Sequence, residues 1–97
     1  MSVLAILNFK LKPENVDDLK NWFKNELQHT RAFDGCNELT VHRNQDDPNN
    51  LVIVESWESR SHYEKYLAWR VERGDVEVLT AWLAEEPTFS YFDNFGV

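Results

Sequence analysis

The sequence is poor in cysteine, glycine and basic residues, and these shortages exclude several kinds of site. A single cysteine, Cys36, excludes an internal disulfide framework and a metal site made of cysteines alone. Only three glycines are present, and they form no glycine-rich phosphate-binding loop. Ten lysines and arginines oppose seventeen acidic residues, which gives a formal net charge of −7. This acidic balance argues against nucleic acid and against an anionic membrane surface as partners, because both favour a basic surface.

The sequence also lacks long apolar runs. None approaches the length of a transmembrane helix, and the stretch from Met1 to Leu7 has no basic region of the kind that opens a signal peptide. The three histidines are not at metal-ligand spacing, so no metal site is expected. We therefore expect a cytoplasmic protein.

Aromatic side chains, in contrast, are abundant, with four Trp, six Phe and three Tyr in 97 residues. A chain of this length is expected to form one domain, residues 1–97, with a core of limited size. Several of the aromatics lie where a monomer would have difficulty burying them. Composition alone therefore favours a homo-oligomer.

The apolar pattern predicts the element order β-α-β-β-α(α)-β. The stripe formed by Val16, Leu19, Phe23 and Leu27 is typical of an amphipathic helix. Ser59 or Ser61 can cap the next helix, and Gly74 interrupts it. The predicted strands are Val3 to Leu11, Cys36 to Arg43, Leu51 to Trp57 and Thr88 to Phe92, and the predicted helices are Pro13 to Arg31, one after Ser59 or Ser61, and a short one from Val76 to Leu83.

This order predicts an α+β fold, the ferredoxin-like split βαβ, in which a four-stranded antiparallel sheet carries its helices on one face. The other face of the sheet is left bare. On the first strand, Val3 and Ala5 share one parity and Leu4 and Ile6 the other, so both faces are apolar at its start. We expect the bare face to be covered by a second copy, in a homodimer that packs sheet against sheet.

Three short segments form a recognisable pattern. Phe33-Asp34-Gly35-Cys36 opens an alternating strand, Asp47-Pro48-Asn49 lies in the hairpin turn, and Val54-Glu55-Ser56-Trp57-Glu58-Ser59 ends the second strand. In order and spacing they resemble the antibiotic biosynthesis monooxygenase (ABM) family, most sharply from Phe33 to Tyr66. The resemblance implies a dimeric α/β barrel with a pocket between the sheet and the helices of each protomer. Some members oxygenate phenolic, quinol or polyketide-like aromatics without metal or flavin, others cleave haem, and many have no known activity.

The resemblance implies site residues only in part. Trp57 stands where the family has its pocket tryptophan, Tyr63 matches a tyrosine near the substrate of aromatic-oxygenating members, and Asn8 lies near an asparagine of haem-cleaving members. Ile53 stands in place of an asparagine of the aromatic-oxygenating type, and Tyr66 in place of a common histidine. Haem-cleaving members ligate iron through a histidine on the second helical segment, and residues 63–86 contain none, which argues against haem.

The candidate catalytic residues are therefore Trp57, Tyr63 and Asn8, and the candidate substrate-binding residues are Tyr66, Phe23, Ile53 and His62. Trp57 is either a pocket wall that stacks on a planar substrate or a core residue at the end of its strand. Asn8 is either a ligand-contacting amide or a residue at the solvated end of its strand.

Two further groups of side chains on the second helical segment carry expectations. Tyr63 and Tyr66 share a helical face that should point at the sheet, and we expect at least one of them to line a cavity. Arg70 and Arg73, with Glu72, are expected to form surface or interface ion pairs of small value.

Three functions are consistent with the sequence. The first is a monooxygenase without cofactor, in which Trp57, Tyr63 and Asn8 hold an electron-rich aromatic that reduces O₂ directly. The second is a non-catalytic small-ligand-binding or structural protein of the same fold, suggested by Ile53 and Tyr66. The third, on family grounds only, is haem degradation.

Overall fold

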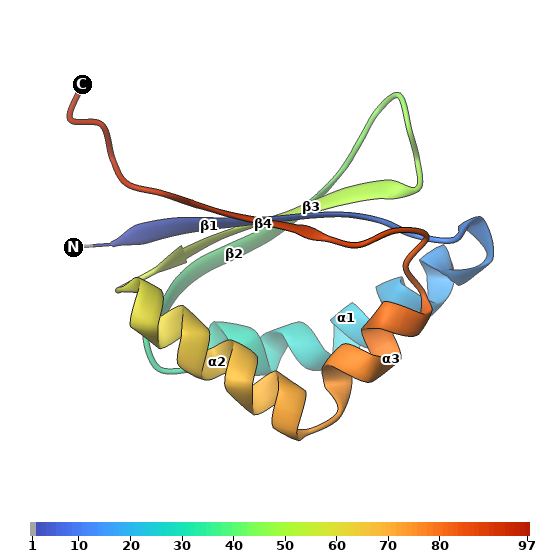
Figure 1. Cartoon of the computed structure of the whole chain (residues 1–97), viewed down its shortest axis with the longest axis horizontal. Coiled ribbons are helices and arrows are strands. Elements are labelled where there is room, and N and C mark those ends of the chain that lie inside the picture. The colour runs from blue at the N-terminus through green and yellow to red at the C-terminus, as the bar shows by residue number, and fades with distance from the viewer. Residues whose placement is uncertain (1) are drawn as a thin grey trace.

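The computed structural model describes residues 2–97 and has the predicted order of elements (Figure 1). A 3₁₀ turn (Pro13–Asn15) leads into the first α-helix, so two elements together form the helix predicted from Pro13 to Arg31. The strands are β1 (Val3–Lys10), β2 (Cys36–Arg43), β3 (Asn50–Trp57) and β4 (Thr88–Phe92), and the helices are α1 (Val16–Arg31), α2 (Arg60–Glu72) and α3 (Asp75–Ala81).

The strands form one antiparallel sheet in the order β2-β3-β1-β4, and the helices lie together on one face of it (Figure 1). This is the ferredoxin-like split βαβ arrangement, so the predicted α+β fold is confirmed. The two central strands pair from Val3 opposite Trp57 to Lys10 opposite Asn50. This register decides which side chains of β1 and β3 face the helices.

The helix-facing side of the sheet holds two apolar clusters at opposite ends of β1. Val3 and Ala5 belong to the first cluster, with Trp57, Tyr63 and Tyr66. Phe9 belongs to the second, together with Leu11, Leu19, Leu27, Leu39 and Ile53. Because side chains alternate along a strand, residues 51, 53, 55 and 57 of β3 face the same side, so Glu55 lies between the two clusters.

The opposite face of the sheet has no helix over it in the described part of the chain (Figure 1). Ile6 pairs with Val54 there, next to Leu4, which is 37% exposed. Phe92 of β4, opposite Leu4, is 49% exposed. An apolar strip of this kind is typical of a surface that another molecule covers.

The turn before β2 depends on Gly35. Its φ of +91° lies in the left-handed region, and its carbonyl accepts a hydrogen bond from the Glu58 amide at 2.8 Å. A Cβ at this position would lie 2.5–2.6 Å from the Cβ and ring carbons of His62. His62 is held in turn by Ser59, the N-cap of α2, whose hydroxyl accepts from the His62 amide. Gly35 therefore permits the start of α2 to pack against the end of α1.

We expect Gly35→Ala to destabilise the fold more than Gly74→Ala. Both glycines have a left-handed φ, but a Cβ at Gly74 would meet nothing within 4 Å. Gly74→Ala therefore measures the backbone strain alone, about 1 kcal/mol, and Gly35→Ala adds the displacement of His62, for a total of about 2–3 kcal/mol. Urea unfolding of the two variants measures the difference, and equal losses would contradict the steric argument.

Candidate functional site

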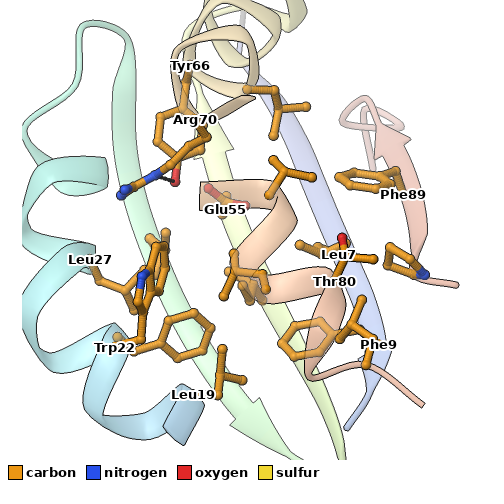
Figure 2. A pocket seen from close by; sticks show the side chains of 18 of the residues that line it. Leu7, Phe9, Leu19, Trp22, Leu27, Glu55, Tyr66, Arg70, Thr80 and Phe89 are labelled. Atoms are coloured by element: carbon orange, nitrogen blue, oxygen red, sulfur yellow. Dashed lines mark hydrogen bonds between the residues drawn. The ribbon is translucent and has the colours of Figure 1, made fainter. Parts of the chain in front are cut away.

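An apolar cavity of about 130 Å³ lies between the sheet and the helices (Figure 2). All four strands and all three helices contribute side chains to it. Most of the lining is hydrocarbon, and polar atoms enter it mainly from β3, α2 and α3. The apolar lining includes Leu7, Phe9, Leu19, Phe23, Leu27 and Ile53, and the polar lining includes Glu55, Tyr63, Tyr66, Arg70 and Thr80.

Glu55 places a buried carboxyl group in the wall of this cavity (Figure 2). Its position opposite the small side chain of Ala5 leaves it room, and the residue is only 3% exposed. The indole N–H of Trp57 donates to its Oε1 at 3.2 Å. Burial raises the pKa of Glu55 to about 7, against the opposing influence of hydrogen bonds from Trp57 and Tyr63 and of the charge of Arg70. This carboxyl group therefore exchanges its proton near neutral pH.

Tyr63 and Tyr66 bring two phenols to the same cavity. The residues are 1% and 8% exposed, and their rings are stacked with centroids 6.1 Å apart. Both rings also pack on Trp57, with centroid distances of 5.5 and 5.2 Å. Burial raises the pKa of each tyrosine above its ordinary value. The two hydroxyls therefore stay protonated near neutral pH, where they can donate or accept hydrogen bonds but cannot act as bases.

Arg70 of α2 connects the three helices on the helical side of the cavity. Its Nη1 donates to Oε1 of Glu26 on α1 at 2.8 Å and to Oδ2 of Asp75 on α3 at 2.9 Å. Its Nη2 donates to the Glu26 carbonyl and to Oγ1 of Thr30, each at 3.0 Å. Its Nε donates to the Tyr66 hydroxyl at 2.9 Å (dashed in Figure 2). All five N–H groups of the guanidinium thus have partners within the protein.

The expectation that Arg70 forms a surface or interface ion pair is therefore wrong. Arg70 is 3% exposed, because the helix periodicity that turns Tyr63 and Tyr66 inward turns Arg70 inward as well. Acids from α1 and α3 compensate its charge, and the guanidinium lies 5.0 Å from the Trp22 ring and 4.7 Å from the Trp69 ring. The hydrogen bond from Arg70 also holds the pKa of Glu26 below its usual value.

The structure brings four of the seven predicted site residues to the cavity. Tyr63, Tyr66, Phe23 and Ile53 all line it, so the expectation for the two tyrosines is confirmed. Trp57 is fully buried and lies in the core beside Glu55, and its hydrogen bond to that carboxyl group is its link to the cavity. The catalytic role of Trp57 stays a prediction.

Asn8 and His62 are not brought together with the others. Asn8 pairs with Val52 and so faces the open side of the sheet, where its Oδ1 accepts from Asn50 at 2.7 Å. The expected grouping of Asn8 with Tyr63 does not form within the chain, because Asn8 has the opposite strand parity to the cavity-lining Leu7 and Phe9. The His62 ring instead forms a 2.6 Å hydrogen bond with the Ser59 hydroxyl.

The two charged residues of the cavity lining, Glu55 and Arg70, were missed as site candidates by reasoning from the sequence. Glu55 has the same parity as Ile53 and Trp57, and a carboxyl group on the apolar parity of a buried strand is the signal that could have found it. Arg70 follows Tyr63 and Tyr66 at helical spacing, which is the signal that could have found it, but it was expected to form an ion pair at the surface or an interface. Within residues 2–97, no three His, Cys, Asp or Glu side chains are grouped as a metal site requires, and no helix has the length and apolar character of a membrane span.

A split βαβ sheet with helices on one face and a small apolar cavity beneath them defines the class as a ferredoxin-like α+β protein. The chain belongs to the antibiotic biosynthesis monooxygenase family, whose model matches residues 2–70. No curated protein sequence matches the chain.

Solved structures share the fold over nearly the whole chain. A conserved protein from Methanosarcina mazei is 18% identical with a TM-score of 0.88, over 97% of this chain and 93% of that one. An antibiotic biosynthesis monooxygenase is 22% identical with a TM-score of 0.85, over 95% and 97%. A variant of SnoaB, a cofactor-independent oxygenase from Streptomyces nogalater, is 16% identical with a TM-score of 0.82, over 99% and 95%. Likeness at these identities shows the fold alone.

Proposed function

We propose that this chain is a monooxygenase without cofactor that oxidises a one-ring phenol or quinol in the cavity beside Glu55. The observation that carries the proposal is the apolar cavity of about 130 Å³ on which the polar groups of Glu55, Tyr63 and Tyr66 converge. An apolar protein cavity of roughly 150 Å³ holds benzene, so the volume suits a single ring better than a polycyclic aromatic. Family membership supports oxygenase chemistry in general.

The proposed reaction is balanced by the substrate and O₂ alone. The substrate supplies all four electrons that reduce O₂. One oxygen atom is retained as a new carbonyl on the ring, and the other leaves as water with the hydroxyl hydrogen and the ring hydrogen that the substrate loses. The protein binds and orients the ring and excludes bulk water from the reacting atoms.

The cavity also bears on the non-catalytic alternative. That alternative predicts a pocket filled by Trp57 and Tyr66. Instead, Trp57 packs in the core and Tyr66 is held at the wall by Arg70 and Thr30, so neither ring fills the cavity that Tyr66 and Leu27 line. An open apolar cavity favours a site that binds a small molecule over a filled structural core, and a carboxyl group in its wall that changes its charge near neutral pH favours the enzyme.

Oxygen uptake tests the proposal, with a matched pair of tryptophan variants. We expect the purified protein, with a chelator present, to consume O₂ faster than buffer does with at least one phenol or quinol of a one-ring panel. Val76 lines the cavity and is 39% exposed, so Val76→Trp should obstruct it and reduce the rate about tenfold or more. Val78 is on the same helix and is 44% exposed, but it does not line the cavity. Val78→Trp should therefore consume O₂ at the wild-type rate. Equal uptake by buffer and all three proteins would reject the enzyme.

We further propose that the protein is a homodimer joined through the open sheet faces. The half-buried Ile6, Val52 and Val54 and the exposed Leu4 and Phe92 form an apolar strip that helices do not cover in the described chain. A second copy would cover this strip with an identical one and bury both.

Charge placed in the strip is expected to separate the dimer. Val54→Lys puts an ammonium group at its centre, opposite Ile6, where burial against a second copy would desolvate it. Sedimentation at micromolar concentration should give a dimer for the wild-type protein and a monomer for the variant. Val71→Lys is the control, because Val71 is 61% exposed on α2, away from the sheet face, and this variant should stay dimeric. A monomeric wild-type protein would contradict the proposal.

A further inference from the structure

We propose that Glu55 accepts the hydroxyl proton of the bound phenol or quinol, which makes it the catalytic base of the proposed monooxygenase. The inference rests on the proposed function and adds a residue role to it. Among the cavity-lining residues of the described chain, Glu55 alone carries a carboxyl group. Its side chain projects from β3 into the space bounded by Leu7, Leu27 and Arg70 (Figure 2). A ring held in that space has its hydroxyl within reach of this carboxyl group.

The Glu55 carboxyl group is held in position and still has free hydrogen-bond acceptor sites for a ligand. The Trp57 indole fixes Oε1 from the sheet side, and a carboxylate has about four acceptor sites on its two oxygens. With one of these used by Trp57 and one near Tyr63, acceptor sites remain for a substrate hydroxyl. Ala5 and Leu39, the β-sheet neighbours of Glu55, are both apolar, so neither strand competes for the proton.

The other titratable groups around Glu55 do not take this role. On α2, Tyr63 and Tyr66 stay protonated, and Arg70 is a permanent cation with every N–H engaged. On α1 and α3, Glu26 and Asp75 are bonded to Arg70.

Two more groups face the same side of the sheet. Cys36 on β2 lies opposite Trp57, and burial raises the pKa of its thiol. Tyr91 on β4 lies opposite Ala5, with its ring 5.8 Å from that of Tyr63. Neither Cys36 nor Tyr91 lines the cavity. Glu55 is therefore the group of this set that both faces the ligand space and changes its charge near neutral pH.

The proton transfer is balanced within the proposed reaction. The substrate O–H bond breaks, the proton moves to Glu55, and the electron pair stays on the substrate oxygen. The resulting phenolate is a stronger reductant and donates electrons to O₂. Glu55 then returns its proton to the oxygen atom that leaves as water, so the carboxyl group ends in its starting state.

Ligand binding tests the contact without requiring turnover. Phenol and toluene are matched in size, and neither changes its charge between about pH 5 and about pH 9. In the wild-type protein, the preference for phenol over toluene should increase about tenfold or more across this range as Glu55 ionises and accepts the hydroxyl. In Glu55→Gln the preference should be independent of pH. Glu58→Gln is the control, because it changes an exposed carboxyl group just after β3. Its phenol preference should have the same pH dependence as that of the wild type. Calorimetric titration measures all three.

Turnover provides the second measurement. With the best substrate of the oxygen-uptake panel, kcat should rise through an apparent pKa near that of Glu55, and Glu55→Gln should lower kcat about 100-fold or more while KM changes little. The role of Glu55 as the base would be rejected if the phenol preference had the same pH dependence in the wild type and in Glu55→Gln. It would also be rejected if the kcat of Glu55→Gln were within a few-fold of the wild-type value. Absence of oxygen uptake together with the Glu55-dependent phenol preference would instead reject the oxygenase and leave the proton contact standing.

Discussion

Arg70→Ala is expected to reduce the free energy of unfolding by about 3–5 kcal/mol, because it removes the buried cation that bonds two largely buried acids and leaves them only the half-exposed Arg73. The side chains of Glu26 and Asp75 are only 18% and 11% exposed, and both bond to Arg70 within 3 Å. The variant also removes a donor from the Tyr66 hydroxyl and from Thr30. For a chain of this size such a loss is a large fraction of the total stability. Urea unfolding at neutral pH measures it.

Arg73→Ala is the matched control for this prediction. Arg73 pairs with the same two acids, at 3.1 and 3.6 Å, but its side chain is 38% exposed. Its loss should cost less than about 1 kcal/mol, since solvent screens the ion pairs of Arg73 and Arg70 still compensates both acids. Similar losses of unfolding free energy in the two variants would mean that the burial of Arg70 adds nothing to the strength of its ion pairs. Arg70→Lys should recover only part of the loss, because an ammonium group has three donors where the guanidinium uses five.

Glu55→Gln is expected to gain stability relative to the wild type as pH rises through neutrality. The pKa of Glu55 is raised from 4.5 to about 7 in the folded chain, so between these values the folded state binds more protons than the unfolded state. The wild-type free energy of unfolding should therefore fall, relative to the glutamine variant, as pH rises from about 4.5 to about 7, and then level off. The total change should be roughly 3 kcal/mol.

Urea unfolding of both proteins at several pH values measures this relative change. A constant offset from the amide itself does not matter, since only the pH dependence of the difference is used. The opposing loss of stability at acid pH from groups such as Glu26, whose pKa is lowered, cancels in the same difference. Glu58→Gln, at an exposed position, should show no comparable change. A difference between the wild type and Glu55→Gln that does not depend on pH would show that Glu55 is ionised in the folded protein as it is in the unfolded chain.

The fold could be predicted from the sequence because its signals are local. Alternation along β2 and β3, the apolar stripe of α1 and the turn residues between them each act within a few residues. The orientation of Tyr63 and Tyr66 toward the sheet followed from helix periodicity in the same way. Ser59 rather than Ser61 proved to be the cap of α2, and both had been considered.

The polar part of the site could not be predicted as readily, because its partners are distant in the sequence. Arg70 is balanced by Glu26, which lies 44 residues away on another helix, and a helical pattern does not show whether such a partner exists. Strand register pairs Asn8 with Val52 on the open face of the sheet, away from the cavity, and parity alone does not show which face the helices cover. Glu55 stands out by its parity, but in the sequence it was interpreted only as part of the family motif from Val54 to Ser59.

The complete internal engagement of Arg70 has a consequence for which aromatics the cavity accepts. An aromatic acid would bring a negative charge to a cavity where Arg70, the one permanent cation among the described lining residues, has no free donor. Above neutral pH Glu55 carries a negative charge of its own there. A neutral phenol of the same size meets no such repulsion. Aromatic carboxylates such as benzoate are therefore expected to be excluded from the cavity, while neutral aromatic alcohols enter.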